Sequence, residues 1–408
     1  MSNKEQRKAP VLRFKGFTDD WEQRKLKDLF KEQITNGIIN NPGKNELNVK
    51  DINVINLYNG DSINIKDLNY INVSESKLKK YQVRKGDIFL TRSSLKKEGI
   101  AKSNILMADS GNYVFDDHVM RLRFSNKVIP YFMNQLLFTS KVRAQFISKA
   151  KTGSMTTIGH NDINKTIVNL PTSTSEQKSV ATILRNINHL IYLQQRKLDE
   201  LIQIKEGIGQ GLLNRHYRNL SIRFNQENSP WKQTKLGKIA SFVNGRAFKQ
   251  KELMNRGLYP VLRVGNFYTN NKWYYSNLNL SPDKYANKGD LLYTWSASFG
   301  PHVWKGPKVI YHYHIWKINF DPAVISKAYL YEFLKLDKKE ILANSNGSTM
   351  IHITKKDMEN KMITVPDMNE QIKIGKILEK LDLKIELNKN KLNNLKSVKQ
   401  FLLQKMFM

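Results

Sequence analysis

The chain has 408 residues, and its 67 lysines and arginines against 36 aspartates and glutamates give a formal net charge of +31. At about 150 residues per domain, this length predicts two or three domains. The 40% of hydrophobic residues argues against a disordered basic tail, and the lack of cysteine excludes disulfide scaffolds, thiol catalysis and cysteine-based zinc sites. The excess positive charge indicates an anionic partner, and nucleic acid is the partner we expect first.

The first residues, from Met1 to Pro10, are charged and lack the apolar centre of a signal peptide. No run of about 18 apolar residues occurs, so no membrane span is predicted. We therefore expect a soluble, cytoplasmic protein that does not associate with membranes.

An internal duplication is predicted, because several motifs occur twice in the same order. The opening motif Arg-Phe-x6-Trp-x-Gln-x-Lys-Leu stands at 13–26 and again at 223–236. Lys-Gly-Asp followed by Ile or Leu stands at 85–88 and again at 288–291. A single shared motif has little weight, but an ordered series of them indicates a repeated structural unit.

Two further pairs extend the series. The β-branched and aromatic runs 113–120 and 309–316 carry a histidine at the same place. Gly-Ser pairs that open the segments 153–155 and 347–349 are each followed, less than 20 residues later, by a proline. Four pairs in one order predict that the chain is built twice.

One long helix is predicted after each unit, beginning with Glu176-Gln177 and with Glu370-Gln371. Apolar residues at every third or fourth position form a seam in each, as in a coiled coil of about four heptads. Polar residues interrupt both seams at matched places, Gln194 and Lys205 in the first and Asn388 and Lys399 in the second. The apolar seam residues are Leu184, Ile187, Ile191, Leu198, Leu201, Ile208 and Leu212, and Leu378, Leu381, Ile385, Leu392, Leu395, Leu402 and Met406.

Matched polar interruptions favour two helices that face each other, since such positions fix the register. The alternative is that each amphipathic helix covers only its own domain. The predicted layout is a first domain over 1–172, a helix over 173–216, a second domain over 217–366 and a helix over 367–408. Because the second domain starts where the first helix ends, the second helix is expected to run back, which makes the pair antiparallel.

Each domain is predicted to be α+β. Short strand-like runs such as Val119 to Phe124 and Ile310 to Phe320 alternate with helical patterns such as Tyr131 to Ile147 and Lys327 to Leu342. A mixed or antiparallel sheet is therefore expected in both domains. The complete fold is two similar domains that alternate with two paired helices, with a pseudo-two-fold internal repeat.

No catalytic motif is recognisable. The glycine-rich cofactor loop and Asn/Asp-Pro-Pro-aromatic tetrapeptide of DNA methyltransferases are missing, as is the phosphate-binding loop of ATP-driven motors. Pro366-Asp367 followed by Asp382-Leu383-Lys384 resembles a nuclease pattern, but Asp382 falls on the second long helix and is interpreted as part of a solvated face. His302, His312 and His314 are interpreted as sheet or groove residues, so no metal site is predicted.

Basic residues neutralise phosphates, but sequence recognition needs side chains that reach base edges. Candidates for both roles lie in loops at matching places of the two units, although each taken singly has the alternative of an ordinary turn or capping residue. The candidates are Thr91, Arg92, Ser93, Ser94, Lys96, Lys97, Lys151, Ser154 and Thr156, and Arg263, Asn266, Thr294, Trp295, Ser296, Ser348 and Thr349. The stretches 90–94 and 293–297 differ between the units and are the better candidates for reading different bases.

These motifs in their duplicated order, in a basic chain without catalytic signatures, resemble the specificity subunit of a type I restriction-modification enzyme. The resemblance covers nearly the whole chain. It implies that each domain is a target recognition domain reading one half of a bipartite, asymmetric sequence in double-stranded DNA. It also implies that the helices are a spacer that sets the number of unread base pairs. A helix from Glu176 to Asn214 is about 58 Å long, so we expect half-sites one to two duplex turns apart.

The resemblance further implies partners. Two modification subunits, which bind S-adenosylmethionine and methylate adenine, dock on the helices, and two restriction subunits add ATP-driven translocation and magnesium-dependent cleavage. The chain itself would bind no cofactor and catalyse nothing. Three alternatives remain open: a self-sufficient nuclease or methyltransferase with an unrecognised site, an RNA-binding coiled-coil protein, and a scaffold for an acidic protein.

Overall fold

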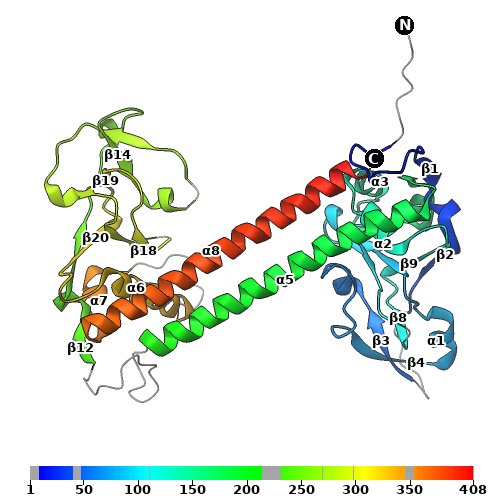
Figure 1. Ribbon diagram of the computed structural model, residues 1–408, viewed down its shortest axis with the longest axis horizontal. Helices are drawn as coiled ribbons and strands as arrows, with labels where there is room; N and C mark the ends of the chain where they lie inside the picture. The colour runs from blue at the N-terminus through cyan, green and yellow to red at the C-terminus, as the bar shows by residue number, and fades with distance from the viewer. Residues whose placement is uncertain are drawn as a thin grey trace, which may run out of the picture. The chain divides into compact units, whose positions relative to one another are not determined.

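The computed structural model describes residues 9–39, 47–109, 111–213, 231–268, 270–296, 298–344 and 353–407. They form two compact units (Figure 1). Unit 1 comprises Met1–Arg196 with Asn390–Met408, and unit 2 comprises Lys197–Lys389. Each unit therefore contains one globular domain together with one part of each long helix.

Among its described residues, the globular part of unit 1 holds one four-stranded and one three-stranded sheet, two two-stranded sheets and four short α-helices. The main antiparallel sheet has the order β2 (Phe30–Asn36), β9 (Val119–Phe124), β5 (Ile88–Thr91), β7 (Ser103–Ile105). The second sheet has the order β4 (Asn69–Val73), β3 (Leu47–Ile52), β8 (Tyr113–Phe115), with a parallel pair β3–β8. Strand β1 (Glu22–Lys25) pairs with β11 (Ile167–Leu170). The helices are α1 (Glu75–Tyr81), α2 (Pro130–Leu137), α3 (Ser140–Lys149) and α4 (His160–Asn164).

Unit 2 repeats this plan. Its main sheet has the order β13 (Ala240–Asn244), β20 (Ile315–Phe320), β17 (Leu291–Thr294), β18 (Gly300–Val303). The second sheet has the order β15 (Tyr274–Ser276), β14 (Tyr259–Leu262), β19 (Val309–Tyr311), β16 (Tyr285–Ala286), again with one parallel pair, β14–β19. Strand β12 (Lys232–Lys235) pairs with β21 (Met362–Val365), and the helices are α6 (Lys327–Asn344) and α7 (Lys355–Asn360). The predicted duplication and α+β class are confirmed.

The central strands β5 and β17 are short apolar runs because they are covered on both faces. In β5, Ile88 and Leu90 belong to the core beneath the helices, and Phe89 belongs to a second core next to the smaller sheet. In β17, Tyr293 and Leu292 divide in the same way between two cores. A strand buried on both faces shows no alternation of polar and apolar residues.

Hydrogen bonds of the opening motif and the Glu-Gln pair join each domain to the start of its helix. The indole Nε1 of Trp21 donates to Glu176 at 3.2 Å, and that of Trp231 donates to Glu370 at 3.0 Å. The amide of Gln177 accepts from the backbone of Ile129 and donates to the carbonyls of Lys127 and Pro171.

Gln371 makes the equivalent bonds in unit 2: it accepts from Ser326 N and donates to the carbonyls of Val324 and Pro366. In unit 1 the carboxylate of Glu176 also receives two bonds from Arg13, at 2.7 and 2.8 Å. The recurring residues are therefore structural, and they explain why the helices begin where they do.

The Lys-Gly-Asp motif is a turn before the central strand. Gly86 and Gly289 have φ of +90° and +95°, a backbone conformation that favours glycine. The carboxylate of Asp87 accepts from the backbone N–H of Arg84, and that of Asp290 accepts from Asn287. The motif is thus a framework element in both units.

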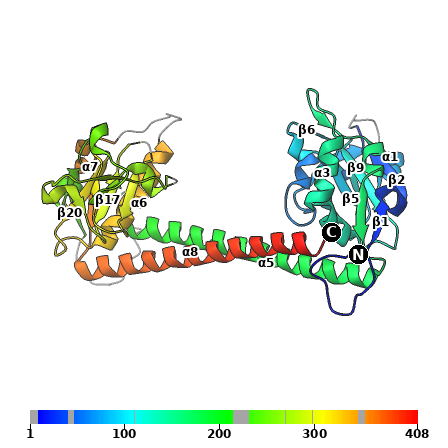
Figure 2. The ribbon, with the colours of Figure 1, turned by 90° about the horizontal axis from the view of Figure 1, so that it is seen from above.

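The long helices are α5 (Thr174–Leu213) and α8 (Met368–Lys405), and in both units they lie side by side (Figure 2). In unit 1, Leu184 near the start of α5 shares a core with Leu402 and Met406 near the end of α8. In unit 2, Leu212 near the end of α5 shares a core with Leu378 near the start of α8. The helices are therefore antiparallel, and every predicted seam residue is buried or half-buried. No described helix is both long and apolar enough to cross a membrane.

The interpretation of Asp382 on α8 holds only in part. Its side chain is 38% exposed, but its carboxylate is also 2.5 Å from the ammonium groups of both Lys205 and Lys335. Burial acts against its ionisation, but the two lysines hold the pKa of Asp382 below its ordinary value. Lys335 lies on α6, so this contact joins the domain of unit 2 to both helices.

Candidate nucleic-acid interface

The two candidate loops of unit 1 form one surface. After β5, the short strand β6 (Ser93–Ser94) pairs with β10 (Thr156–Thr157) in antiparallel register. The backbone of Lys151 exchanges two hydrogen bonds with Thr157, both of 2.9 Å. These contacts unite segments that lie more than 50 residues apart in the sequence.

The cations on this surface are accessible. The side chains of Arg92, Lys96, Lys97 and Lys151 are exposed, as is Ser154, while Ser93 and Ser94 are half-buried. A cavity of ≈ 700 Å³ adjoins them, and it combines hydroxyl, ammonium and apolar groups. It is lined by Val54, Tyr58, Ser93, Ser94, Leu95, Lys96, Glu98, Gly99, Lys102, His118 and Met155. Such a mixed lining offers donors for base edges beside cations for phosphates.

Four candidates are wrong as contact residues. Thr91 and Thr294 are fully buried, and their hydroxyls donate to the carbonyls of Gly99 and Ser298, both at 2.8 Å. Thr156 and Ser296 are also buried. The physical reason is that the central strand and its continuation are covered by other parts of the domain, which a local sequence pattern does not reveal.

The amide of Asn266 is bonded within the protein as well, and its assignment as a base reader stays a prediction. Its Oδ1 accepts from the backbone N–H of Arg263 at 3.0 Å, which caps the short turn 264–267. Its Nδ2 donates to the carbonyls of Asn270 and Lys272. The guanidinium of Arg263 lies 4.3 Å from the ring centre of Tyr274 and is half-buried.

This capped turn is a repeated feature that the sequence analysis missed. In unit 1, Asn56 accepts from the backbone of Asn53 and caps the turn 54–57. The exposed tyrosines that follow, Tyr58 and Tyr268, donate their hydroxyls to the carbonyls of Gly99 and Ser298. The pattern Val-x-Asn-x-Tyr stands at 54–58 and 264–268, at the same offset as the opening motif, and would have revealed the pair.

Arg92 and Trp295 occupy equivalent positions in the two units. The backbone N–H of Arg92 donates to the carbonyl of His118, and that of Trp295 donates to the carbonyl of His314. Their own carbonyls accept from Ile158 and from Ile353. The same main-chain geometry therefore presents a guanidinium in unit 1 and an indole in unit 2.

The surroundings of Trp295 are aromatic. Its indole Nε1 donates to the carbonyl of Tyr313 at 2.9 Å, and its ring stacks on Trp316 at 5.8 Å. His302 stacks on Phe267 at 3.9 Å, and burial lowers the pKa of both His302 and His312 to about 4, so these two rings are neutral at pH 7.

Unit 1 differs at the positions that match the histidines of unit 2. There Asp116, Asp117 and His118 bring ligand atoms within 4.8 Å of one another, the one such group found in the described part of the chain. Acidic groups at a surface commonly adopt this arrangement without an ion, so the group carries no assignment. Ser348 and Thr349 lie outside the described residues.

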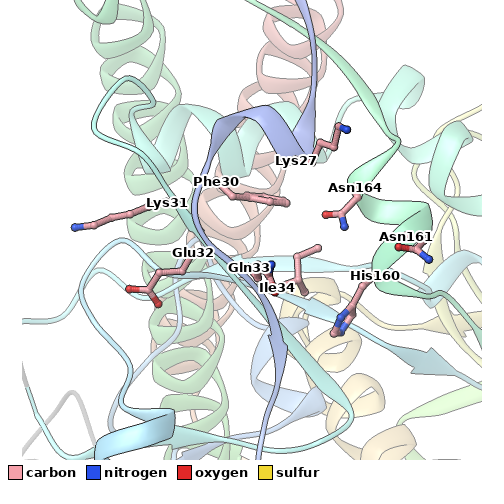
Figure 3. A pocket seen from close by; sticks show the side chains of 9 residues that line it. All are labelled: Lys27, Phe30, Lys31, Glu32, Gln33, Ile34, His160, Asn161 and Asn164. Carbon is pink, nitrogen blue, oxygen red and sulfur yellow. The ribbon is translucent and has the colours of Figure 1, made fainter.

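A second cavity in unit 1, of ≈ 550 Å³, lies between β2 and α4 (Figure 3). Figure 3 shows His160, Asn161 and Asn164 of α4 facing Gln33 and Ile34 of β2. The Nε2 of His160 is 2.8 Å from the Oδ1 of Asn36, and burial, together with the charge of Arg92, lowers the pKa of His160. No motif pointed to this cavity, whose full lining is Lys27, Phe30, Lys31, Glu32, Gln33, Ile34, His160, Asn161 and Asn164.

Comparison with known proteins shows which family has this architecture. Residues 18–203 and 228–397 both match the type I restriction modification DNA specificity domain. The chain is 24% identical over 396 residues to a protein of Methanocaldococcus jannaschii assigned as the type I restriction enzyme MjaX specificity subunit, across 94% of this chain and 91% of that protein. It is 22% identical over 170 residues to the EcoBI specificity subunit of Escherichia coli, across 41% of this chain and 36% of that one.

Solved structures agree on the fold. The S subunit of the type I restriction-modification system of M. genitalium superposes with a TM-score of 0.61 at 16% identity, over 98% of this chain and 99% of that one. A second type I system, studied for its assembly and conformational transition, gives 0.55 at 15% identity, over 95% and 97% of the two chains. With both specificity domains matched and the whole architecture shared, the chain belongs to the family of type I restriction-modification specificity subunits.

Proposed function

We propose that this chain selects the DNA site of a type I restriction-modification complex, each globular domain reading one half of a bipartite, asymmetric duplex sequence. The observation that carries the proposal is the equivalence of Arg92 and Trp295. Two copies of one framework present different chemistry at the same backbone position, which suits two different half-sites. A duplicated protein that bound two identical targets would need no such difference.

The chemistry of each half-site follows from these side chains. A guanidinium such as that of Arg92 bonds the O6 and N7 of guanine in the major groove. The indole of Trp295 has its donor occupied by Tyr313, so it offers an apolar surface, which suits the methyl group of thymine or a stacked base. Exposed Lys96, Lys97 and Lys151 are placed to neutralise phosphates beside the first half-site.

Catalysis would belong to partners. We propose that two modification subunits, which bind S-adenosylmethionine and methylate adenine, dock on the helix pair, and that two restriction subunits bring ATP and magnesium chemistry. This chain would hold no cofactor and act in the cytoplasm by directing the other subunits. The family match and the lack of recognised catalytic motifs in the sequence support this division of labour.

Mapping of methylated adenines tests the proposal. Cells that express the chain together with its modification partner should carry methylation at one asymmetric sequence with two fixed blocks and an unread gap. Arg92→Ala should relax the first block alone, and Trp295→Ala the second alone. Methylation that is independent of this chain, or that falls in a single uninterrupted palindrome, would contradict the proposal.

Two further incubations address the alternatives. The purified chain alone, supplied with DNA, magnesium and S-adenosylmethionine, is expected neither to cleave nor to methylate the DNA. Activity in proportion to the amount of chain would show that the chain is itself an enzyme. The aromatic surface around Trp295 and Tyr313 also suits stacked single strands. Duplex DNA should nevertheless compete better than single-stranded RNA for the chain, and the reverse order would favour RNA binding.

A further inference from the structure

A partly buried group of four charged side chains lies where the domain of unit 2 meets both helices. The ammonium group of Lys205, on α5, is 2.5 Å from Asp382 of α8 and 3.1 Å from Glu332 of α6. The ammonium group of Lys335 bonds the same two carboxylates, at 2.5 and 3.1 Å. The side chains of Glu332 and Lys205 are 6% and 14% exposed, and those of Lys335 and Asp382 are 29% and 38% exposed. Three helices therefore share one ionic group.

Unit 1 has a polar group at the corresponding junction. Asp61 of the domain accepts from the hydroxyl of Tyr131 on α2 at 2.5 Å and from the amide of Asn188 on α5. The amide of Asn188 also donates to Tyr131, at 2.9 Å. Burial raises the pKa of Asp61, whereas Tyr131 and the nearby ammonium group of Lys399 on α8 favour its charged form. The domain and α5 therefore share one polar group, and the charge of Lys399 on α8 acts on it.

The internal repeat relates the two groups. When the two helices are aligned as repeats, Asn188 corresponds to Asp382 and Lys205 corresponds to Lys399. In each unit the lysine comes from the helix that follows the other domain: Lys205 follows the first domain but contacts the second, and Lys399 follows the second domain but lies beside Asp61 of the first. These lysines are the matched polar interruptions of the apolar seams.

A lysine buried in a seam acts on register more than on stability. An apolar seam tolerates a shift of one heptad, because leucine meets leucine again. A buried ammonium group without a carboxylate partner is costly, while its net gain when paired is small. The observed helix positions pair Lys205 with Glu332 and Asp382, and a shifted or rotated helix leaves Lys205 unpaired. Lys399 is likewise half-buried, and the negative charge of Asp61 acts on it.

We propose that Lys205 and Lys399 are positioning residues that fix both helices in register against the globular domain of their unit, and thereby fix the number of unread base pairs. The second clause rests on the proposed DNA-reading function. The first does not, and the experiment separates the two.

The variants are Lys205→Met and Lys399→Met, which keep the length of the side chain and remove its charge. Exposed Lys197→Met and Lys396→Met on the same helices are matched controls, and Lys205→Arg tests rescue by a retained charge. Each full-length chain, in complex with its modification partner, selects duplexes from a library with randomised blocks and a variable gap. Circular dichroism and a single unfolding transition for each unit verify that every variant folds.

The wild type and controls should enrich one gap length. Lys205→Met and Lys399→Met should enrich the same blocks with gaps one base pair longer and shorter, with the preference for the native gap reduced about tenfold, because looser positioning lowers the effective concentration of the second domain. Lys205→Arg should restore the preference. Uniform loss of affinity with an unchanged gap distribution would mean that the lysines only stabilise, and would overturn the second clause.

Hydrogen exchange tests the first clause without DNA. Lys205→Met should raise exchange of α5 and α6 peptides around 200–210 and 328–338 about tenfold, and leave the unit 1 peptides around 180–190 unchanged. Lys399→Met should do the reverse. If neither variant exceeds its control, the positioning role is wrong. If the wild type selects no bipartite duplex while exchange responds as expected, the proposed function fails and the positioning role stands.

Discussion

At the end of the central strand, the two units have the same backbone and different side chains. Thr91 and Thr294 are identical in type, fully buried and bonded to equivalent carbonyls, whereas the next residues, Arg92 and Trp295, differ. At this strand end, the two identical threonines are buried, and the two residues after them, which differ between the units, are more accessible to solvent.

The smaller sheets show a second contrast. Asp51 on β3 and Val261 on β14 occupy equivalent places beside the parallel partner strand. Both are buried, but only Asp51 carries an ionisable group. Burial and the neighbouring Asp116 raise the pKa of Asp51 to about 7. One copy therefore contains a titratable group in its core where the other has hydrocarbon.

The largest difference is expected at the ion pairs of the Lys-Gly-Asp turns. The guanidinium of Arg123 is buried and bonds both Asp87 and Glu32, whereas Lys317 bonds Asp290 at a more exposed place. Arg123→Met should lower the free energy of unfolding of unit 1 by about 3–5 kcal/mol, since it leaves the buried carboxylate of Asp87 without a cationic partner. Lys317→Met should cost unit 2 only about 1 kcal/mol. Urea unfolding measures both, and equal losses would show that the turns are equivalent in energy as well as in shape.

The buried carboxyl group of Asp51 should make the stability of unit 1 depend on pH in a way that the stability of unit 2 does not. Because its pKa is raised in the folded state, Asp51 reduces stability as the pH rises from about 4 to 7, and the full penalty holds above pH 7. Asp51→Asn should therefore stabilise unit 1 at pH 8 by roughly 2–4 kcal/mol and have little effect below pH 4. Exposed Asp67→Asn is the control. A pH profile of unfolding that is unchanged by Asp51→Asn would rule out a buried titrating carboxylate.

Alanine substitution of Arg92 and of Trp295 tests the role of these two residues in specificity. Arg92→Ala is expected to relax one position of the first half-site, with a loss of discrimination of about 1–3 kcal/mol. Trp295→Ala should do the same for the second half-site and leave the first untouched. Binding to single-base variants of the mapped site measures this, and a uniform loss over all variants would assign both residues to the framework.

The smallest effect is expected from the exposed cations. Lys96→Ala or Lys151→Ala should weaken binding to all sequences alike and reduce the slope of affinity against salt concentration by about one. Thr91→Val, a buried neighbour that contacts no ligand, should leave this slope unchanged. A lysine variant that altered the preferred DNA sequence would show that this lysine reads a base.

The helices and the repeated framework were predictable because their signals are local. A seam of apolar residues, a Glu-Gln pair and a glycine at a turn each specify short-range geometry, and two copies in one order reinforce each other. The antiparallel pairing also followed from the layout, since the second domain begins where the first helix ends. The capped turn at 54–57 was accessible to the same reasoning and was overlooked.

The candidate site was predicted less well, because exposure and partner choice are not local. Thr91, Asn266 and Asp382 were of the right chemical types, yet their polar groups are bonded within the protein. The cavity beside His160 joins segments that no motif connects.

The sequence by itself determined that this chain is a duplication, with two domains and two matched helices, because periodicity and repetition are properties of the order of residues. Only the tertiary structure decided which polar side chains face solvent and which satisfy one another. That decision depends on what covers each strand and on which helix supplies the neighbouring charge. Arg92 is exposed to solvent and Lys205 is half-buried beside Asp382, although both are single cations in a basic sequence.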